Sequence, residues 1–153
     1  MSNKVLPAKT EEFIQEAAGM MMLWGMPAMP ARIFGYLLLQ SEPASLDQIA
    51  ADLEMSKSTA SVAARLLERY LLIRRQGERG TKRVFYEVSS SYVGFLLEEA
   101  QRLGAFGEFL HKRASVAPSK ITVKRLKQME RFFLGMRDAM TTAVETLSAK
   151  IHD

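Results

Sequence analysis

Residues 45–88 read SLDQIAADLEMSKSTASVAARLLERYLLIRRQGERGTKRVFYEV and contain two helical patterns, each preceded by a serine. Ser45 and Ser56 are predicted N-caps, because a serine hydroxyl can accept a hydrogen bond from a free N–H of the first helical turn. Gln48 lies three residues after Ser45, which completes a capping box. The second helix is expected to extend to about Tyr70. Two short helices joined by a tight turn are typical of a helix-turn-helix.

A β-hairpin is predicted directly after the second helix, with strands at residues 71–75 and 82–88 and a glycine-containing tip between them. In the second strand Val84, Tyr86 and Val88 alternate with more polar residues, so one side of the hairpin is expected to pack on a core. A hairpin in this position is the wing of a winged helix-turn-helix. The sequence therefore predicts a mainly α fold with a small β-hairpin wing.

The second helix has the two faces that a recognition helix needs, one that packs on the domain and one that meets the DNA major groove. Ala60, Ala63 and Leu67 share one face by helical spacing. The residues predicted to contact DNA lie at the helix start and on the opposite face: Ser56, Lys57, Ser58, Thr59, Ser61 and Arg65. An ordinary amphipathic surface helix would show the same pattern, so the helix alone does not establish DNA binding.

The predicted wing adds basic side chains, and four of them are predicted to contact DNA: Arg75, Arg79, Lys82 and Arg83. From Ser56 to Arg83 the chain has eight basic and two acidic residues, whereas its total net charge is only +4. Like charges crowded at a hairpin tip repel one another unless a polyanion accepts them. A basic wing that directly follows a helix-turn-helix favours double-stranded DNA as the partner.

Two helices are predicted on the N-terminal side of this unit, within residues 9–43. The first is expected to begin with Thr10 as its N-cap and to stop near Gly25. The second has Pro30 in its first turn and is expected to end at Glu42-Pro43.

Two further helices are predicted within residues 89–153. A serine among residues 89–91 is expected to cap the first, which extends to about Ala114, and the second follows Pro118. Apolar residues recur along the second at steps of three and four, and five of them are predicted to form a homodimer interface: Phe133, Met136, Met140, Val144 and Leu147. The whole chain, residues 1–153, is expected to form one domain with dimerisation helices at both ends.

The composition argues against several other classes of protein. The chain has no cysteine, which fits a reducing compartment such as the cytoplasm, and no apolar run of signal-peptide or membrane-span length. His111 and His152 have no neighbouring ligands at metal spacing, and no catalytic triad, paired carboxylates or phosphate loop is present. We therefore expect neither an enzyme nor a metal or cofactor site.

The sequence also resembles a known family. It is similar to the GbsR branch of the MarR-type transcriptional regulators in four segments: Gly25-Met26-Pro27, Arg32-Ile33-Phe34-Gly35-Tyr36-Leu37-Leu38-Leu39, Ser56-Lys57-Ser58-Thr59-Ala60-Ser61 and Gly80-Thr81-Lys82-Arg83-Val84-Phe85-Tyr86. The resemblance implies a winged-helix homodimer that represses or otherwise regulates a promoter, sometimes in response to a small molecule. The chain departs from the family pattern at Ala31 and Leu71, where glycine is common.

That family branch is associated with choline or glycine betaine, whose quaternary ammonium groups bind aromatic faces. Five aromatic residues are candidates for such faces: Trp24, Tyr36, Tyr92, Phe106 and Phe132. The simpler interpretation is that these side chains fill the core or a dimer interface, so no effector is named.

Two other functions fit part of the sequence. A winged helix can mediate protein assembly without reading DNA, but such a module does not require the basic wing. A small-molecule carrier is disfavoured because helix packing accounts for the apolar residues.

Overall fold

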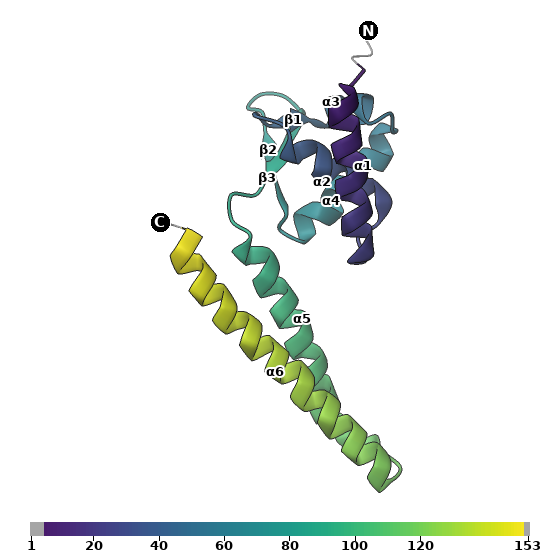
Figure 1. The fold of residues 1–153 in the computed structure, drawn as a ribbon, viewed down its shortest axis with the longest axis vertical. Coiled ribbons are helices and arrows are strands. Elements are labelled where there is room, and N and C mark those ends of the chain that lie inside the picture. The colour runs from purple at the N-terminus through teal and green to yellow at the C-terminus, as the bar shows by residue number, and fades with distance from the viewer. Residues whose placement is uncertain (1–4, 152–153) are drawn as a thin grey trace. The chain divides into compact units, whose positions relative to one another are not determined.

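The computed structural model describes residues 5–151, so His152 lies outside the described residues. The chain divides into two compact units, Met1–Ser90 and Ser91–Asp153, called here the N-terminal and C-terminal units. Among the described residues, the N-terminal unit contains helices α1 to α4 and a small sheet, and the C-terminal unit contains the long helices α5 and α6 (Figure 1).

The N-terminal unit begins with α1 (Ala8–Leu23) and α2 (Ala28–Leu38). The prediction that Thr10 caps α1 is wrong. Pro7 is the N-cap, and its carbonyl oxygen accepts hydrogen bonds from the backbone N–H groups of Thr10 and Glu11, both at 3.0 Å. The fixed φ of proline suits a helix entry even without a side-chain cap. Helix α2 also ends earlier than predicted, because the chain must become extended before Pro43 and enter a strand.

The predicted helix-turn-helix is confirmed as α3 (Leu46–Asp52) and α4 (Lys57–Arg69). Ser45 Oγ accepts a hydrogen bond from Gln48 N, and Ser56 Oγ accepts one from Thr59 N, both at 3.1 Å. Both N-caps are therefore where the sequence predicted them. Each bond spans only three residues, so it forms as soon as the helix does.

The sheet has three antiparallel strands in the order β1 (Ala44–Ser45), β3 (Val84–Val88) and β2 (Ile73–Gly77). Strand β1 was not predicted, and it pairs Ala44 with Tyr86. Strand β2 begins two residues later than predicted. The N–H of Leu72 bonds to the carbonyl of Leu67 at 3.1 Å, so this residue still belongs to the end of α4.

Three helices of this unit end in the same motif, in which a residue with positive φ reverses the chain. After α1, α3 and α4 these residues are Gly25 (φ 92°), Glu54 (φ 54°) and Leu71 (φ 61°). In each case the following N–H bonds to a carbonyl five residues earlier, as in a Schellman motif. Leu71 thus occupies the left-handed position at which the family resemblance led us to expect glycine.

The core of the N-terminal unit forms where α1, α2, α3, α4 and the sheet meet. Its largest fully enclosed side chains are Tyr36, Ile14, Ile33, Ile49, Leu53, Leu67 and Ile73. The predicted inner face of the second strand is confirmed, since Tyr86 is buried in this core and Val84 and Val88 pack against it. Helix α4 is thereby fixed to the wing through a shared core.

The C-terminal unit is a helical hairpin of α5 (Val93–Lys112) and α6 (Lys120–Ile151), joined by the 3-10 turn η1 (Ala114–Val116). The predicted serine cap of α5 is not formed. Tyr92 holds the N-cap position without a side-chain hydrogen bond, and the N–H of Ser89 bonds to the carbonyl of Leu72 at 3.0 Å, which extends the end of the wing.

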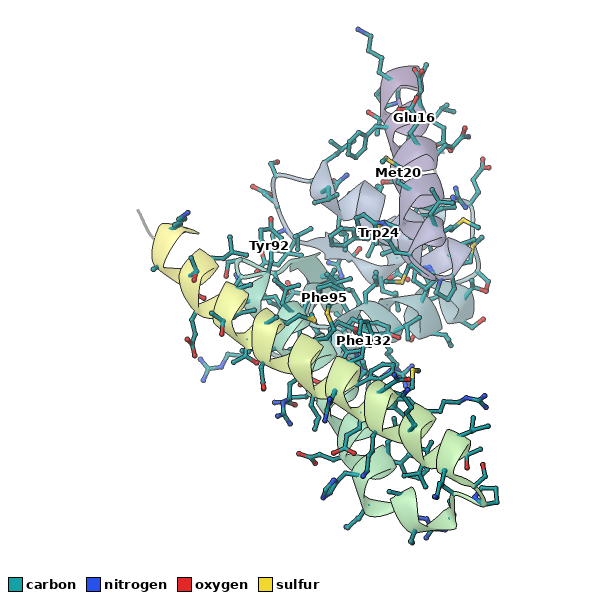
Figure 2. The ribbon with its side chains drawn as sticks, turned by 60° about the horizontal axis from the view of Figure 1, so that its bottom comes forward. Glu16, Met20, Trp24, Tyr92, Phe95 and Phe132 are labelled. Carbon is teal, nitrogen blue, oxygen red and sulfur yellow. The ribbon has the colours of Figure 1, made fainter. Side chains whose placement is uncertain are left out.

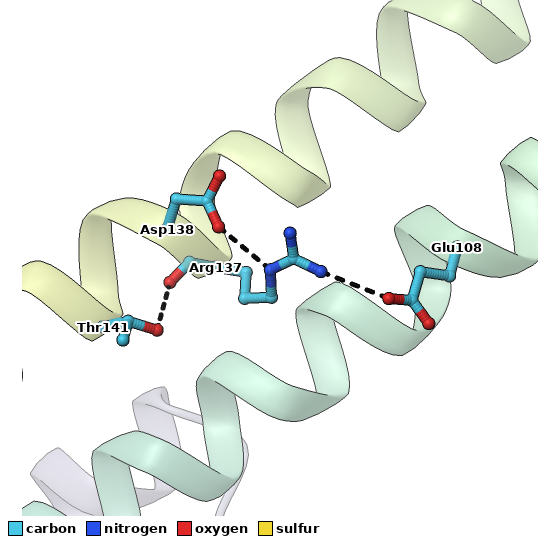
Figure 3. Close-up of polar contacts among 4 residues, drawn as sticks. All are labelled: Glu108, Arg137, Asp138 and Thr141. Carbon is cyan, nitrogen blue, oxygen red and sulfur yellow. Dashed lines mark hydrogen bonds and ion pairs between the residues drawn. The ribbon is translucent and has the colours of Figure 1, made fainter.

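Glycines let α5 and α6 approach each other closely. A Cβ on Gly104 would overlap the side chain of Arg137, and one on Gly107 would lie 2.8 Å from Leu134. Figure 3 shows Arg137 reaching Glu108 on α5 and Asp138 on its own helix, with N···O distances of 3.3 and 3.1 Å. Gly104 faces Arg137 and Gly107 faces Leu134, so residue numbers rise along α5 as they fall along α6, and the two helices are antiparallel.

The predicted dimerisation stripe divides between two faces of α6. Phe133 contacts Phe106 of α5 edge-on, with ring centroids 4.8 Å apart, and Val144 is buried. Met136 and Leu147 remain exposed, and Met140 is half-buried. Part of the stripe thus packs within the chain, and the rest is available to a partner.

An outward apolar face of α6 also contains residues outside the predicted set. We call Met129, Phe132, Met136 and Leu147 the outer α6 face, because their side chains are all exposed. Phe132, labelled in Figure 2, is 58% exposed. Among the described residues, no helix combines the length and the hydropathy required for a membrane span.

Candidate nucleic-acid interface

The inward face of α4 fixes which residues point outward. Ala60, Ala63, Ala64 and Leu67 are buried. At 100° per residue the opposite direction is shared by Ser58, Val62, Arg65 and Arg69, which are all exposed. We call these four residues the outer α4 face. Two of them, Ser58 and Arg65, were predicted to contact DNA.

The N-terminus of α4 carries a small cluster of hydroxyl groups. Ser56 Oγ lies 3.1 Å from Ser58 Oγ and donates to Thr59 Oγ1 at 2.8 Å. Thr59 and Ser61 are half-buried, so they are less accessible than Ser58. The free N–H groups and hydroxyls at a helix N-terminus are suited to a phosphate oxygen.

Lys57 lies beside the base of the wing. A hollow of about 190 Å³ is lined by Ser45, Leu46, Asp47, Lys57, Lys82, Arg83 and Val84. The structure thus brings three of the predicted DNA-contacting cations together from α4 and from the wing. Lys57 Nζ also lies 2.9 Å from Asp47 Oδ1, but both side chains are about two-thirds exposed, so water weakens this ion pair.

A second group of cations gathers between α4 and β2. A hollow of about 580 Å³ there is lined by Val62, Arg65, Glu68, Arg69 and Arg75. The buried Tyr86 lies near this group. Burial raises the pKa of its hydroxyl and Glu68 adds to the rise, while the positive charges of Arg75 and Arg65 oppose it. Arg65 of α4 and Arg75 of β2 therefore both lie close enough to Tyr86 for their charges to affect its hydroxyl.

The wing tip is a structured turn. The N–H of Glu78 bonds to the carbonyl of Arg83 at 3.2 Å, and Thr81 Oγ1 donates to the Glu78 carboxylate at 3.0 Å. The Arg83 guanidinium lies over the ring of Phe85, 5.2 Å from its centroid. Arg79 is exposed at the tip and lines neither cationic hollow.

Most of these cations have no acidic partner. Within residues 5–151 none of the following forms an ion pair: Arg65, Arg69, Arg75, Arg79, Lys82 and Arg83. Arg74 differs, because it pairs with Glu87 on the neighbouring strand. The positive charge of the predicted interface is therefore available to an external anion.

The predicted site omitted Val62 and Arg69. Both could have been found from spacing, because residues 58, 62, 65 and 69 follow the steps of four and three that place side chains on one helix face.

A second basic surface lies in the C-terminal unit. A hollow of about 440 Å³ along α6 is lined by Val123, Gln128 and four cations, Lys120, Lys124, Lys127 and Arg131. The four cations follow helical spacing. We call these four cations the α6 basic stripe. These four cations were not among the predicted site residues, and they lie on an amphipathic helix outside any binding motif.

The structure bears on two further expectations. In the described part of the chain, no three His, Asp or Glu side chains are grouped as metal ligands, and His111 instead contacts Glu130 at 2.8 Å. Tyr36, one of the aromatic candidates for an effector, is fully buried and cannot offer its ring face. Trp24 is exposed at the end of α1, where Figure 2 shows it with Met20.

Comparison with known proteins identifies the fold. The sequence matches no protein-family model and no curated protein. A crystal structure described as that of a transcriptional regulator is similar with a TM-score of 0.82, over 92% of this chain and 99% of the other, at 20% identity. The fold is a winged helix. The crystal structure of a MepR mutant, from a multidrug-resistant S. aureus clinical isolate, matches 86% of this winged-helix chain and 91% of its own chain at 22% identity. Its TM-score is only 0.44, so the fold assignment rests on the first structure.

Proposed function

We propose that this protein is a sequence-specific, double-stranded DNA-binding transcriptional regulator of the MarR type. One observation carries the proposal: the exposed cations of α4 and of the wing line shared hollows, Lys57 with Lys82 and Arg83, and Arg65 with Arg75. The likeness in fold to a transcriptional regulator and the resemblance to the GbsR branch support it.

The arrangement suits the two parts of DNA recognition. Phosphate contacts position a protein on the duplex, and contacts to base edges in the major groove specify the sequence. The outer α4 face offers a hydroxyl at Ser58 and a guanidinium at Arg65, both of which can bond base edges. Lys82, Arg83 and Arg79 of the wing are suited to phosphates, since they have no acidic partner in the described chain.

We further propose that the regulator acts as a homodimer on a pseudo-palindromic operator and represses by occupying the promoter. The outer α6 face supports a second copy as the partner, because an exposed apolar row along one helix is unfavourable in water. Two recognition helices would then read half-sites about one helical turn of DNA apart. DNA binding would place the protein in the cytoplasm, with which its cysteine-free sequence is consistent. No effector is assigned.

The first experiment measures the affinity for random duplexes as a function of salt. Lys82→Ala should weaken binding to all duplexes about equally and lower the salt slope by roughly one unit, because one phosphate contact is lost. Lys9→Ala removes an exposed lysine of α1 and serves as the matched control. If both variants keep the wild-type slope, the wing is not part of the interface.

The second experiment tests sequence reading. Arg65→Ala should cost about 1 to 3 kcal/mol on a duplex selected from a randomised pool and much less on random DNA, if Arg65 contacts a base. Equal losses on both would reassign Arg65 to the phosphate backbone.

A protein-assembly module remains the alternative function, and the α6 basic stripe offers a rival surface for polyanions. The double variant Lys124→Ala and Lys127→Ala separates the two surfaces. Retained selection of a duplex by this variant supports the α4 and wing interface. A wild-type chain that selects no duplex at all contradicts the proposed function.

A further inference from the structure

Val62 is an apolar side chain at the centre of the outer α4 face. It is 68% exposed, with Ser58 one turn before it and Arg65 and Arg69 after it. A β-branched residue is a weaker helix former than alanine, since its side chain loses rotamer freedom. Little of Val62 is buried in return. The stability of α4 therefore does not account for a valine here.

Val62 lies on the surface between two hollows and lines both of them. One hollow, of about 480 Å³, is lined chiefly by apolar side chains that include Pro27, Met29 and Pro30. The other contains Arg65 and Arg75. Val62 and Arg69 line both hollows. A side chain in this position would meet the floor of a groove into which α4 was inserted, while the cations beside it would meet the groove walls.

The major groove offers one apolar group to such a side chain. Thymine carries a C5 methyl group there, whereas the other base edges present hydrogen-bond donors and acceptors. The major groove is about 12 Å wide and admits an α-helix, so a centrally placed valine can reach a base edge. The charge around Val62 suits the same occupant, because its cationic neighbours can hold phosphates.

We propose that Val62 determines specificity by packing its methyl groups against the C5 methyl of a thymine in each half-site. The inference rests on the proposed function and adds to it a particular base and a particular contact. Val62 would favour thymine over cytosine at that position without forming any hydrogen bond.

The test uses the full-length protein and a duplex that the wild-type chain has selected from a randomised pool. Each thymine of one half-site is replaced in turn by deoxyuridine, which removes only the methyl group. Affinities are measured for the wild type, for Val62→Ala and for Val116→Ala. Val116 is the matched control, since it is 63% exposed and lies in η1 of the other unit. Alanine favours helix, so Val62→Ala is expected to fold, which thermal melting by circular dichroism checks.

One deoxyuridine position should weaken binding by the wild type and by Val116→Ala about fourfold, the factor that corresponds to the burial of one methyl group. The same replacement should leave binding by Val62→Ala unchanged. The inference is overturned if the wild type tolerates deoxyuridine at every position, or if Val62→Ala loses as much as the wild type. A chain that selects a duplex yet tolerates every deoxyuridine keeps the proposed function, whereas a chain that selects no duplex loses both.

Discussion

The hydroxyl of Tyr36 donates a hydrogen bond to Oδ2 of Asp52 at 2.6 Å and so ties α2 to the first helix of the helix-turn-helix. Tyr36 is fully buried, and its ring lies in the same core as Ile49 and Leu67. The position of α3 against α2 therefore depends on a polar contact as well as on apolar packing.

Tyr36→Phe should lower the free energy of unfolding by about 1.5 kcal/mol, because a hydrogen bond to a carboxylate is lost while the ring is kept. Urea unfolding followed by circular dichroism measures the change. Tyr92→Phe is the control, since Tyr92 is half exposed and should be neutral. A Tyr36→Phe protein as stable as the control would mean that water replaces the lost bond.

Stability should fall as the pH rises above about 10. Burial raises the pKa of Tyr36, and the hydrogen bond and negative charge of Asp52 raise it further. The phenol ionises more easily in the unfolded chain, so its contribution is complete below the unfolded pKa and is lost as the pH rises through the folded one. Urea midpoints measured up to about pH 11 should decline less in Tyr36→Phe than in the wild type. Equal declines would assign the alkaline loss to other groups.

Glu54→Gly should raise the free energy of unfolding by about 0.5 to 1 kcal/mol. Glu54 is exposed and has φ 54°, a conformation that costs an ordinary residue roughly 1 kcal/mol and glycine nothing. Gly25→Ala is the converse control, since φ is 92° and no atom lies within 4 Å of an added Cβ, so only backbone strain can act. The explanation fails if the two substitutions change stability in the same direction.

Gly107→Ala should destabilise the α5–α6 hairpin by about 1 to 3 kcal/mol, because the added Cβ would lie 2.8 Å from Leu134 and the helices would have to separate. Gly135→Ala on α6 has open space around the new Cβ and should stabilise the helix by up to about 1 kcal/mol. Thermal unfolding of the two variants measures the contrast. A neutral Gly107→Ala would show that the two helices can separate at little cost.

Phe132→Glu should dissociate the proposed homodimer while the chain stays folded, because Phe132 is exposed in the single chain and a carboxylate buried at an interface would lack a partner. Sedimentation and binding to the selected duplex measure both effects, since a monomer loses the avidity of two reading heads. Thr142→Glu is the control, because Thr142 is exposed on the same helix but is turned away from the outer α6 face. If the dimer survives Phe132→Glu, its interface lies elsewhere. Val144 is not a useful site for this test, because it is buried within the single chain and a charge there would disturb folding.

The local parts of the fold could be read from the residues alone. Ser45 and Ser56 bond to N–H groups three residues away, so their caps depend on almost nothing beyond the neighbouring sequence. The inner face of β3 and the buried face of α4 follow from periodicities of two and 3.6 residues. The exposed cations of the wing were predictable for the same reason, because a hairpin tip is solvated whatever the rest of the chain does.

Contacts between distant residues required the folded chain. No local feature of the sequence indicates that Ala44 pairs with Tyr86, or that Arg65 and Arg75 line one hollow. By helix propensity alone Gly107 would only weaken α5, yet its missing side chain makes room for Leu134 of α6. An apolar stripe likewise shows that a helix has something to bury, but only packing assigned Phe133 to α5 and left Phe132 exposed. The reason is physical: a hydrogen bond within one turn costs little chain entropy, so local sequence specifies it, whereas a long-range contact forms only where the whole core has brought both partners together.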